Sequence, residues 1–307
     1  MTTKDKDKAK DKDKDKDHAV VPPTVPPSGF ARRKNEIIFG LTLLTVVYIA
    51  IYFGFYNSPL FRAADEYCGN APDEETCIRS DLFGFQVSSG IMQLFMGTTG
   101  FLAWQWTQTA HKSLPNTPTA RLFGYLEDAD KLNAGILVFQ LWDFIFSLLI
   151  PEHRTAVFLA HHVLSGMTAW FSLQHQLFHH YAIFFGGCSE ISTIFLVVCD
   201  FDVFFPASSG PTGSTSWWAL FVTFCQVGFT IAFLYYRIVG WCFHSIQLWK
   251  DVLYVTQTKK GLAEQYRPGK TWFLYLFLFM DVALGSLQIY WFAFGIIPKI
   301  RQVLQEQ

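Results

Sequence analysis

The sequence predicts an all-α membrane protein, a bundle of about seven transmembrane helices. Of its 307 residues, 51% are hydrophobic, 18% are aromatic and only 16% are charged, whereas a soluble domain carries about 25% charged residues. The apolar residues gather in long runs that approach the roughly 20 residues needed to cross the hydrocarbon core. Backbone groups in lipid must pair within a helix or a closed barrel, and the alternation of barrel strands is absent. The runs are therefore predicted to be helices.

The first 36 residues are predicted to form a disordered cytosolic tail. Lys and Asp alternate almost perfectly over residues 4–17, so this run has no apolar face to bury. A Pro-rich stretch, VVPPTVPP at 20–27, follows and favours an extended chain. The first apolar run begins late and is long enough to span the membrane, so no signal peptide is expected.

Seven apolar segments are predicted to span the membrane. In chain order they are residues 37–57, 83–106, 133–150, 155–173, 177–199, 217–243 and 271–297. The second is the weakest because it contains several Gly and Thr residues. Arg237 lies near the predicted cytosolic end of the sixth, where a long cationic side chain can reach the membrane interface.

The Lys and Arg residues outside these segments predict the orientation. With the alternating tail omitted, they are concentrated on the side that holds the N-terminus, which is therefore expected to be cytosolic. Residues 37–82 then comprise the first transmembrane helix and an acidic non-cytosolic loop, and residues 298–307 form a C-terminal tail on that same non-cytosolic side. The loop contains Cys68 and Cys77. Whether they pair is left open, although the compartment allows a disulfide.

Three of the apolar segments carry ionisable groups where a membrane helix normally has none. These are Asp143, the adjacent pair His161 and His162, and Glu190. At about 1.5 Å of rise per residue, Asp143 and His161 lie at similar depths on either side of the turn at Pro151. The distance of Glu190 from the end of its own segment gives a similar depth. The groups are therefore expected to form one layer, which Asp281 of the last segment approaches from below.

Other polar residues recur at helical spacing around this layer, so each set shares a helix face. The sets are Gln140 with Asp143 and Ser147; His161 with Ser165, Thr168 and Ser172; and Glu190 with Thr193. His162, Gly166 and Ala169 form a neighbouring stripe that would let another helix approach closely. These polar faces are expected to meet inside the bundle.

Intramembrane ionisable groups mark a functional site by default, and a polar knot that only joins helices is the alternative. A carboxylate bonded to one imidazole nitrogen makes the other nitrogen a better base or nucleophile. The candidate catalytic residues are therefore His161, His162, Asp143 and Glu190. No cofactor and no metal are expected, since adjacent histidines diverge on a helix and the run at His175, His179 and His180 has no nearby Cys or acidic partner. No nucleic-acid groove is present.

The run LWDFIFSLLIPEHRTAVFLAHHVLSGMTAWFSL, followed by GGCSEISTIFLVV, resembles the TLC-domain membrane proteins. The likeness consists of an aromatic-Asp pair, a Pro-marked turn, a His-His pair before Leu-Ser, and Glu-x-Ser-Thr, and it extends over about 83–297. It implies a helical bundle of the endoplasmic reticulum or plasma membrane. In the ceramide synthase branch the His-His pair, here His161 and His162, carries acyl transfer. Ser189-Glu190-Ile191-Ser192-Thr193 stands where that branch has His-Asp-x-Ser-Asp, which favours the non-synthase branch.

Three functions remain open from the sequence. The first is a lipid-homeostasis protein whose polar layer binds or modifies a membrane lipid or acyl chain. The second is an acyltransferase that uses acyl-CoA as donor. The third is a non-enzymatic cargo receptor or adaptor of the early secretory pathway. The sequence predicts no particular lipid and no oligomeric state.

Overall fold

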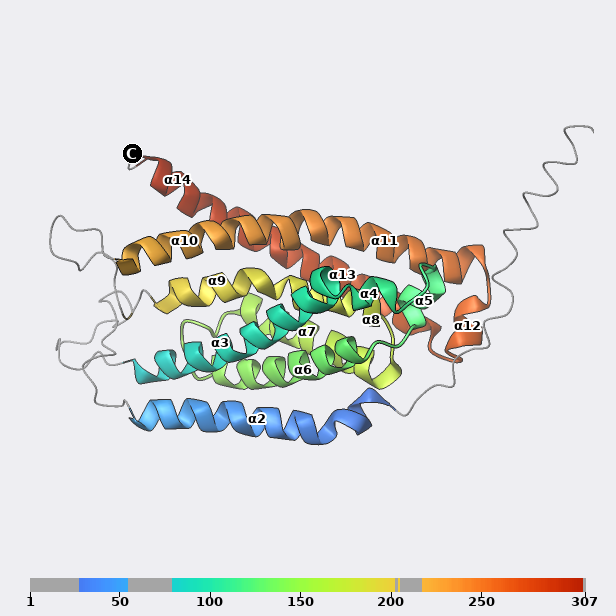
Figure 1. Cartoon of the computed structure of the whole chain (residues 1–307), viewed down its shortest axis with the longest axis horizontal. Coiled ribbons are helices and arrows are strands. Elements are labelled where there is room, and N and C mark those ends of the chain that lie inside the picture. The colour runs from blue at the N-terminus through green and yellow to red at the C-terminus, as the bar shows by residue number, and fades with distance from the viewer. Residues whose placement is uncertain (1–27, 55–78, 202–203, 205–216, 306–307) are drawn as a thin grey trace, which may run out of the picture.

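The computed structural model describes residues 28–54, 79–201, 204 and 217–305. Across these ranges the chain is helical and contains no strand, which confirms the all-α prediction. The Lys/Asp run and the pair Cys68 and Cys77 lie outside the described residues. Figure 1 shows the long helices running side by side along one axis, with the start of α2 toward the end that holds α5 and α12 and the C-terminus at the opposite end.

The long helices match the predicted segments in order, and π-helical stretches (η) interrupt or extend several of them. They are α2 (Gly29–Gly54), α3 (Ser80–Phe101) with η4 (Leu102–Trp106), α6 (Glu127–Ser147), α7 (Ala156–His175), α8 (His179–Ala182) with η5 (Ile183–Cys188) and α9 (Glu190–Asp200), α10 (Trp217–Ala232) with η8 (Phe233–Gly240), α11 (Trp241–Leu253) and η9 (Tyr254–Thr258), and α13 (Thr271–Trp291) with η10 (Phe292–Ile296) and α14 (Ile297–Gln305). Short helices α4 (Thr109–Lys112), α5 (Pro118–Phe123) and α12 (Leu262–Tyr266) connect them.

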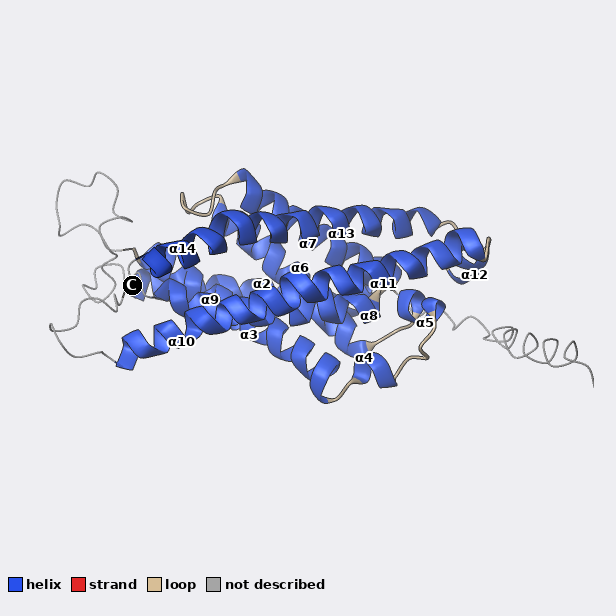
Figure 2. Ribbon diagram, turned by 90° about the horizontal axis from the view of Figure 1, so that it is seen from above, coloured by secondary structure: helices blue, strands red, loops and turns tan. Residues whose placement is uncertain are grey.

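Five of these helical stretches are long and apolar enough to cross a membrane, so the chain is a multi-pass membrane protein. They contain α2, α7, α8 to α9, α10 to η9, and α13 to η10. The expected count of seven is not confirmed, because α3 and α6 carry more polar side chains. Both are nevertheless long helices that pack against other helices of the bundle (Figure 2), and both carry buried polar side chains.

Helix α6 is the centre of the packing, since it contacts α2, α3 and α7. The largest buried cluster gathers side chains from these helices, with Trp142 stacked between Phe85 and Phe146. Glycines allow the closest helix approach. A Cβ added at Gly100 of α3 or at Gly187 of η5 would collide with the backbone of the other. The two helices therefore touch beside the stretch that leads into Glu190.

The sixth predicted segment was wrong at its end. The helix does not stop near residue 243 but continues from Trp217 to Thr258. The extension contains charged residues, among them Lys250 and Asp251. These lower the local hydropathy, so the segment was predicted to end before them. It is stabilised within the protein, because Asp251 accepts hydrogen bonds of 2.6 Å from both Nε and Nη2 of Arg121 on α5. Arg237 consequently lies in the middle of this helix, not near its end.

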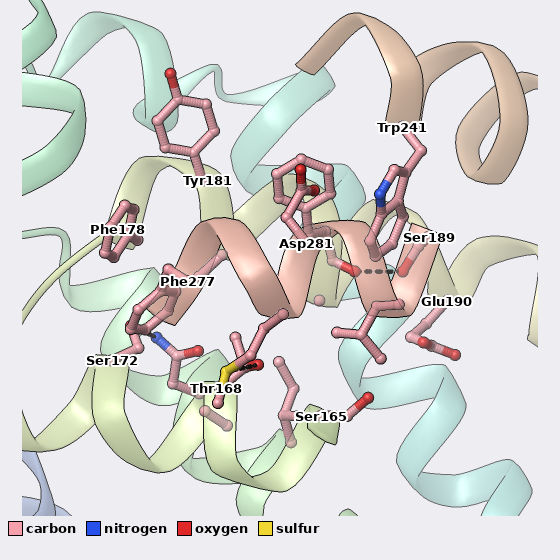
Figure 3. A pocket seen from close by; sticks show the side chains of 18 of the residues that line it. Ser165, Thr168, Ser172, Phe178, Tyr181, Ser189, Glu190, Trp241, Phe277 and Asp281 are labelled. Carbon is pink, nitrogen blue, oxygen red and sulfur yellow. Dashed lines mark hydrogen bonds between the residues drawn. The ribbon is translucent and has the colours of Figure 1, made fainter. Parts of the chain in front are cut away.

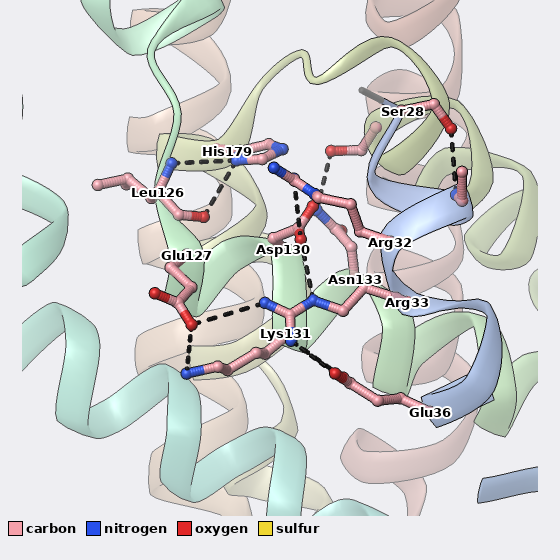
Figure 4. Close-up of polar contacts among 12 residues, drawn as sticks. Ser28, Arg32, Arg33, Glu36, Leu126, Glu127, Asp130, Lys131, Asn133 and His179 are labelled. Atoms are coloured by element: carbon pink, nitrogen blue, oxygen red, sulfur yellow. Dashed lines mark hydrogen bonds and ion pairs between the residues drawn. The ribbon is translucent and has the colours of Figure 1, made fainter. Parts of the chain in front are cut away.

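Helix α2 is attached to the bundle by an ion-pair cluster at its first turns (Figure 4). The side chain of Asp130 on α6 is fully buried and lies 3.0 Å from Nε of Arg33 and 3.1 Å from Nη2 of Arg32. Arg33 also bonds to Glu36 one turn further along α2. Aromatic contacts continue the attachment, with Tyr48 against Phe146. The helix is therefore held by charge at one end and by aromatic packing toward the other.

Replacing Asp130 by Asn is predicted to destabilise the protein by about 3 kcal/mol, because two arginines lose a buried carboxylate. The value is at the low end for a broken buried pair, since Arg32 and Arg33 keep some solvent contact. The measurement is the free energy of unfolding of detergent-solubilised protein by denaturant titration. Glu127→Gln is the control, because Glu127 is exposed. Equal effects of the two substitutions would contradict the central role of Asp130.

Candidate functional site

All four predicted site residues line one cavity of about 480 Å³. Asp143 comes from α6, His161 and His162 from α7, and Glu190 from α9. The remaining walls come from α3, the turn before α7, α10, η8, the end of α13, η10 and α14. A volume of this size lies within the range of small-molecule sites in proteins, about 300–1,000 Å³. The structure thus brings together residues that are 47 positions apart in the sequence.

His162 is bonded at both ring nitrogens. Its Nδ1 lies 2.7 Å from Oε1 of Gln140, and its Nε2 lies 3.2 Å from Oδ1 of Asp143. The same Asp143 oxygen accepts a 2.7 Å hydrogen bond from Ser147 one turn along α6. Because an amide oxygen only accepts, Nδ1 donates to Gln140, and Nε2 faces the carboxyl group of Asp143. His162 is therefore fixed in orientation between Gln140 and Asp143.

His161 is in a different position. It is partly buried, and its Nδ1 has no hydrogen-bond partner among the described residues. Its ring meets the edge of Trp291 at 5.1 Å between centroids and lies 5.5 Å from the ring of His162. A buried ring nitrogen without a partner is unusual in proteins and calls for a ligand or water. Of the two histidines, His161 is the one with a nitrogen available to a ligand.

Glu190 is paired with Arg237, which the sequence reading placed at the membrane interface. Arg237 is instead buried, with its Nη2 2.9 Å from Oε2 of Glu190. The guanidinium has four further partners: Ser189 O at 3.0 Å, Ser192 Oγ at 2.9 Å, Thr193 Oγ1 at 2.8 Å and Gln288 Oε1 at 3.1 Å. It joins η8 to α9 and α13. The sequence places Arg237 within one predicted span and Glu190 within another. A cation and an acid in two spans are the signal that could have predicted this buried pair.

Three π-helical stretches border the cavities. η5 ends two residues before Glu190, η8 carries Arg237, and η10 supplies Gly295 and Ile296 to the wall of the large cavity. A π-helical turn widens the helix by one residue and is often found at functional sites. Here the widened turns place Arg237 and the start of α9 at the cavity.

A smaller cavity of about 90 Å³ continues from the first. Gln140, His161, Glu190 and Arg237 line both cavities. The small cavity also meets the α7 face with Ser165, Thr168 and Ser172, together with Asp281 on α13 (Figure 3). Asp281 accepts a 2.7 Å hydrogen bond from Ser245, so it is anchored to α11. It therefore approaches the layer through the second cavity.

The far end of the large cavity is lined by Glu152, His153, Asp200 and Lys299. Glu152 precedes α7 and accepts a 2.6 Å hydrogen bond from Nη1 of Arg79, the residue before α3. This bond lowers the pKa of Glu152 below its usual value of 4.5. The pair closes the turn between α6 and α7 against the start of α3.

Three further histidines, His175, His179 and His180, contribute to packing outside the two cavities. His179 is buried with Nδ1 3.1 Å from the backbone N and O of Leu126, and His180 has Nδ1 2.9 Å from Ala110 O. His175 stacks on Phe273 with ring centroids 4.0 Å apart. None of the three is among the residues that line either cavity.

The family model of the TLC domain (TRAM, LAG1 and CLN8) matches residues 83–296. The match covers more than half of the chain, so the protein belongs to the TLC-domain family. This membership indicates a membrane lipid-related function. Searches of the curated proteins and of the solved structures gave no match.

Replacing Arg237 by Gln is predicted to destabilise the protein by about 3 kcal/mol, because the Glu190 carboxylate would be left buried without a cation. The double variant Arg237→Gln/Glu190→Gln should recover part of the loss, since both charges are then removed. The measurement is a double-mutant cycle of unfolding free energies in detergent. A double variant as unstable as the sum of the two single variants would show that the two groups are not coupled.

The Arg79–Glu152 pair predicts a pH dependence. A carboxyl whose pKa is lower in the folded state stabilises the protein above its unfolded pKa, and that stabilisation is lost as the pH falls through the folded pKa. Glu152→Gln should therefore lower the Tm at about pH 7, and its gap to wild type should narrow towards about pH 3. The measurement is Tm in detergent across this range. A gap that stays constant with pH would refute the assignment.

Proposed function

We propose that this protein maintains membrane lipid composition by binding or modifying a lipid or acyl chain in the large cavity. The observation that carries the proposal is the meeting of Asp143, His161, His162 and Glu190 at one cavity within an apolar bundle. Intramembrane ionisable groups are expensive and are by default functional. A pure packing role would not require an open volume beside them.

The walls of the cavity suit an amphiphile. Aromatic and aliphatic side chains from α7, α10, η8 and α13 line it beside the polar layer, among them Phe158, Phe229, Phe233 and Trp291. Ligand sites combine mostly apolar walls with a few placed polar groups. A lipid or fatty acyl chain has the matching division into an apolar part and a polar end.

Acyl transfer from acyl-CoA is the second candidate, and the free nitrogen of His161 favours it. In such a reaction His161 takes the proton of an acceptor hydroxyl or amine as the new C–O or C–N bond forms. The thioester C–S bond breaks, and the proton leaves with the CoA thiolate. His162, held by Gln140 and Asp143, would not react itself. It would hold the turn of α7 that carries His161 in place.

His161→Ala is predicted to abolish the effect of the protein on cellular lipids while leaving the fold intact, because Nδ1 of His161 makes no hydrogen bond to another described residue. The measurement is a whole-lipid mass spectrum of cells that express each variant at matched levels. His175→Ala on the same helix is the matched control, since His175 lies outside both cavities. An unchanged lipid shift in His161→Ala would contradict the proposal.

A second variant, Gly295→Phe, tests the cavity in the same measurement. A Cβ at Gly295 would meet no atom within 4 Å, and Gly295 lines the large cavity. The aromatic ring should occupy the cavity and remove the lipid effect. Gly54→Phe on α2 is its control, because Gly54 also has open space around it but lines neither cavity. Purified protein incubated with CoA thioesters and acceptor lipids then separates binding from acyl transfer.

A further inference from the structure

A polar stripe on α3 faces the large cavity and has no part in the His/acidic layer. Gln86, Ser89 and Gln93 recur at helical spacing, are each more than nine-tenths buried, and all line the cavity. These residues lower the hydropathy of the second predicted segment further, in addition to its Gly and Thr residues. Because these polar side chains lie on the cavity wall, they can contact a ligand in the cavity and need not contact bulk water.

Gln93 is the member of the stripe whose side chain has an unpartnered oxygen among the described residues. Its side chain is only 5% exposed, and its Oε1 has no hydrogen-bond partner among the described residues. Nδ1 of His161, on the wall of the same cavity, is also without a partner. Buried polar atoms are nearly always hydrogen-bonded, and both residues line the large cavity, so a group bound there can supply the missing partners. An amide oxygen accepts only, so the group must donate to it.

The acidic groups beside the polar layer already have partners within the protein. Asp143 faces His162, Glu190 bonds to Arg237, and Glu152 bonds to Arg79. Asp200 and Lys299, of opposite sign, line the same end of the cavity. A phosphate or a quaternary ammonium beside His161 would have to break the Asp143–His162 or the Glu190–Arg237 contact, which is costly for buried charges. A neutral headgroup would not.

We infer that the large cavity recognises a lipid whose headgroup carries several hydroxyls, such as a glycerol, inositol or sugar group. Hydroxyls both donate and accept, as the amide oxygen of Gln93 and the imidazole of His161 require. The apolar faces of such a group and the attached acyl chain fit the aromatic walls at Phe229, Phe233 and Trp291. This inference rests on the proposed lipid function and names its ligand class.

The test is native mass spectrometry of the purified full chain, released from micelles doped with equal amounts of oleoyl lipids. The probes are monooleoylglycerol, an oleoyl sugar ester, oleoyl lysophosphatidylcholine and oleic acid. Wild type should retain one or both of the polyol lipids in preference to the other two. The polyol lipid that is retained more strongly identifies the preferred headgroup. Gln93→Leu should weaken that binding about fivefold, the effect of one hydrogen bond.

Gln226→Leu is the matched control, because Gln226 lies exposed on α10 and lines neither cavity. It should bind as wild type does. Equal binding of all four lipids by wild type would overturn the polyol inference while leaving the lipid function standing, and this comparison needs no variant to fold. A preference unchanged by Gln93→Leu would also overturn it. Binding of none of the lipids would overturn both proposals.

Discussion

The high cost of an unpaired charge inside a membrane bundle determines how this protein is arranged. The buried carboxylates lie against groups on other helices: Asp130 with Arg33, Asp143 with His162, Glu190 with Arg237, Asp251 with Arg121, and Asp281 with Ser245. Each such contact stabilises one relative position of two helices, because moving them apart would strand the charge. The polar contacts therefore select the packing that the non-directional apolar contacts allow.

The same constraint distinguishes the two adjacent histidines. Adjacent residues on a helix point about 100° apart, so His162 points toward α6, where Gln140 and Asp143 hold it, and His161 lines both cavities. The pair thus combines a fixed member with an available one. The fixed ring supports α7 against α6 at the depth where the available ring would meet a ligand.

Much of this arrangement could be predicted from the sequence. The apolar runs predicted the helices, and helical spacing predicted that Asp143 shares a face with Gln140 and that Glu190 shares one with Thr193. In the structure Asp143 and Gln140 both contact the ring of His162, and Thr193 donates to Glu190. The position of Arg237 could not be predicted by hydropathy, since the polar residues around Lys250 and Asp251 look like a helix end. Their burial depends on Arg121, which lies far away in the sequence.

The stripe on α3 was missed for a related reason. Gln86, Ser89 and Gln93 lower the hydropathy of the segment, and sequence alone does not tell a weak membrane helix from one that faces an internal cavity. Only the arrangement of α3 beside α9 and α6 makes that distinction. Polar residues within a predicted span therefore depend for their meaning on tertiary neighbours.

The central claim is that the cavity beside His161 holds a lipid. The most direct test is a cryo-electron microscopy map of the full chain in lipid nanodiscs, with an antibody fragment bound to add mass. The account predicts elongated density inside the cavity, with one end beside His161 and Gln93, and its loss in Gly295→Phe. A cavity that is collapsed, or that contains only separate water-sized features in the wild type, would contradict it.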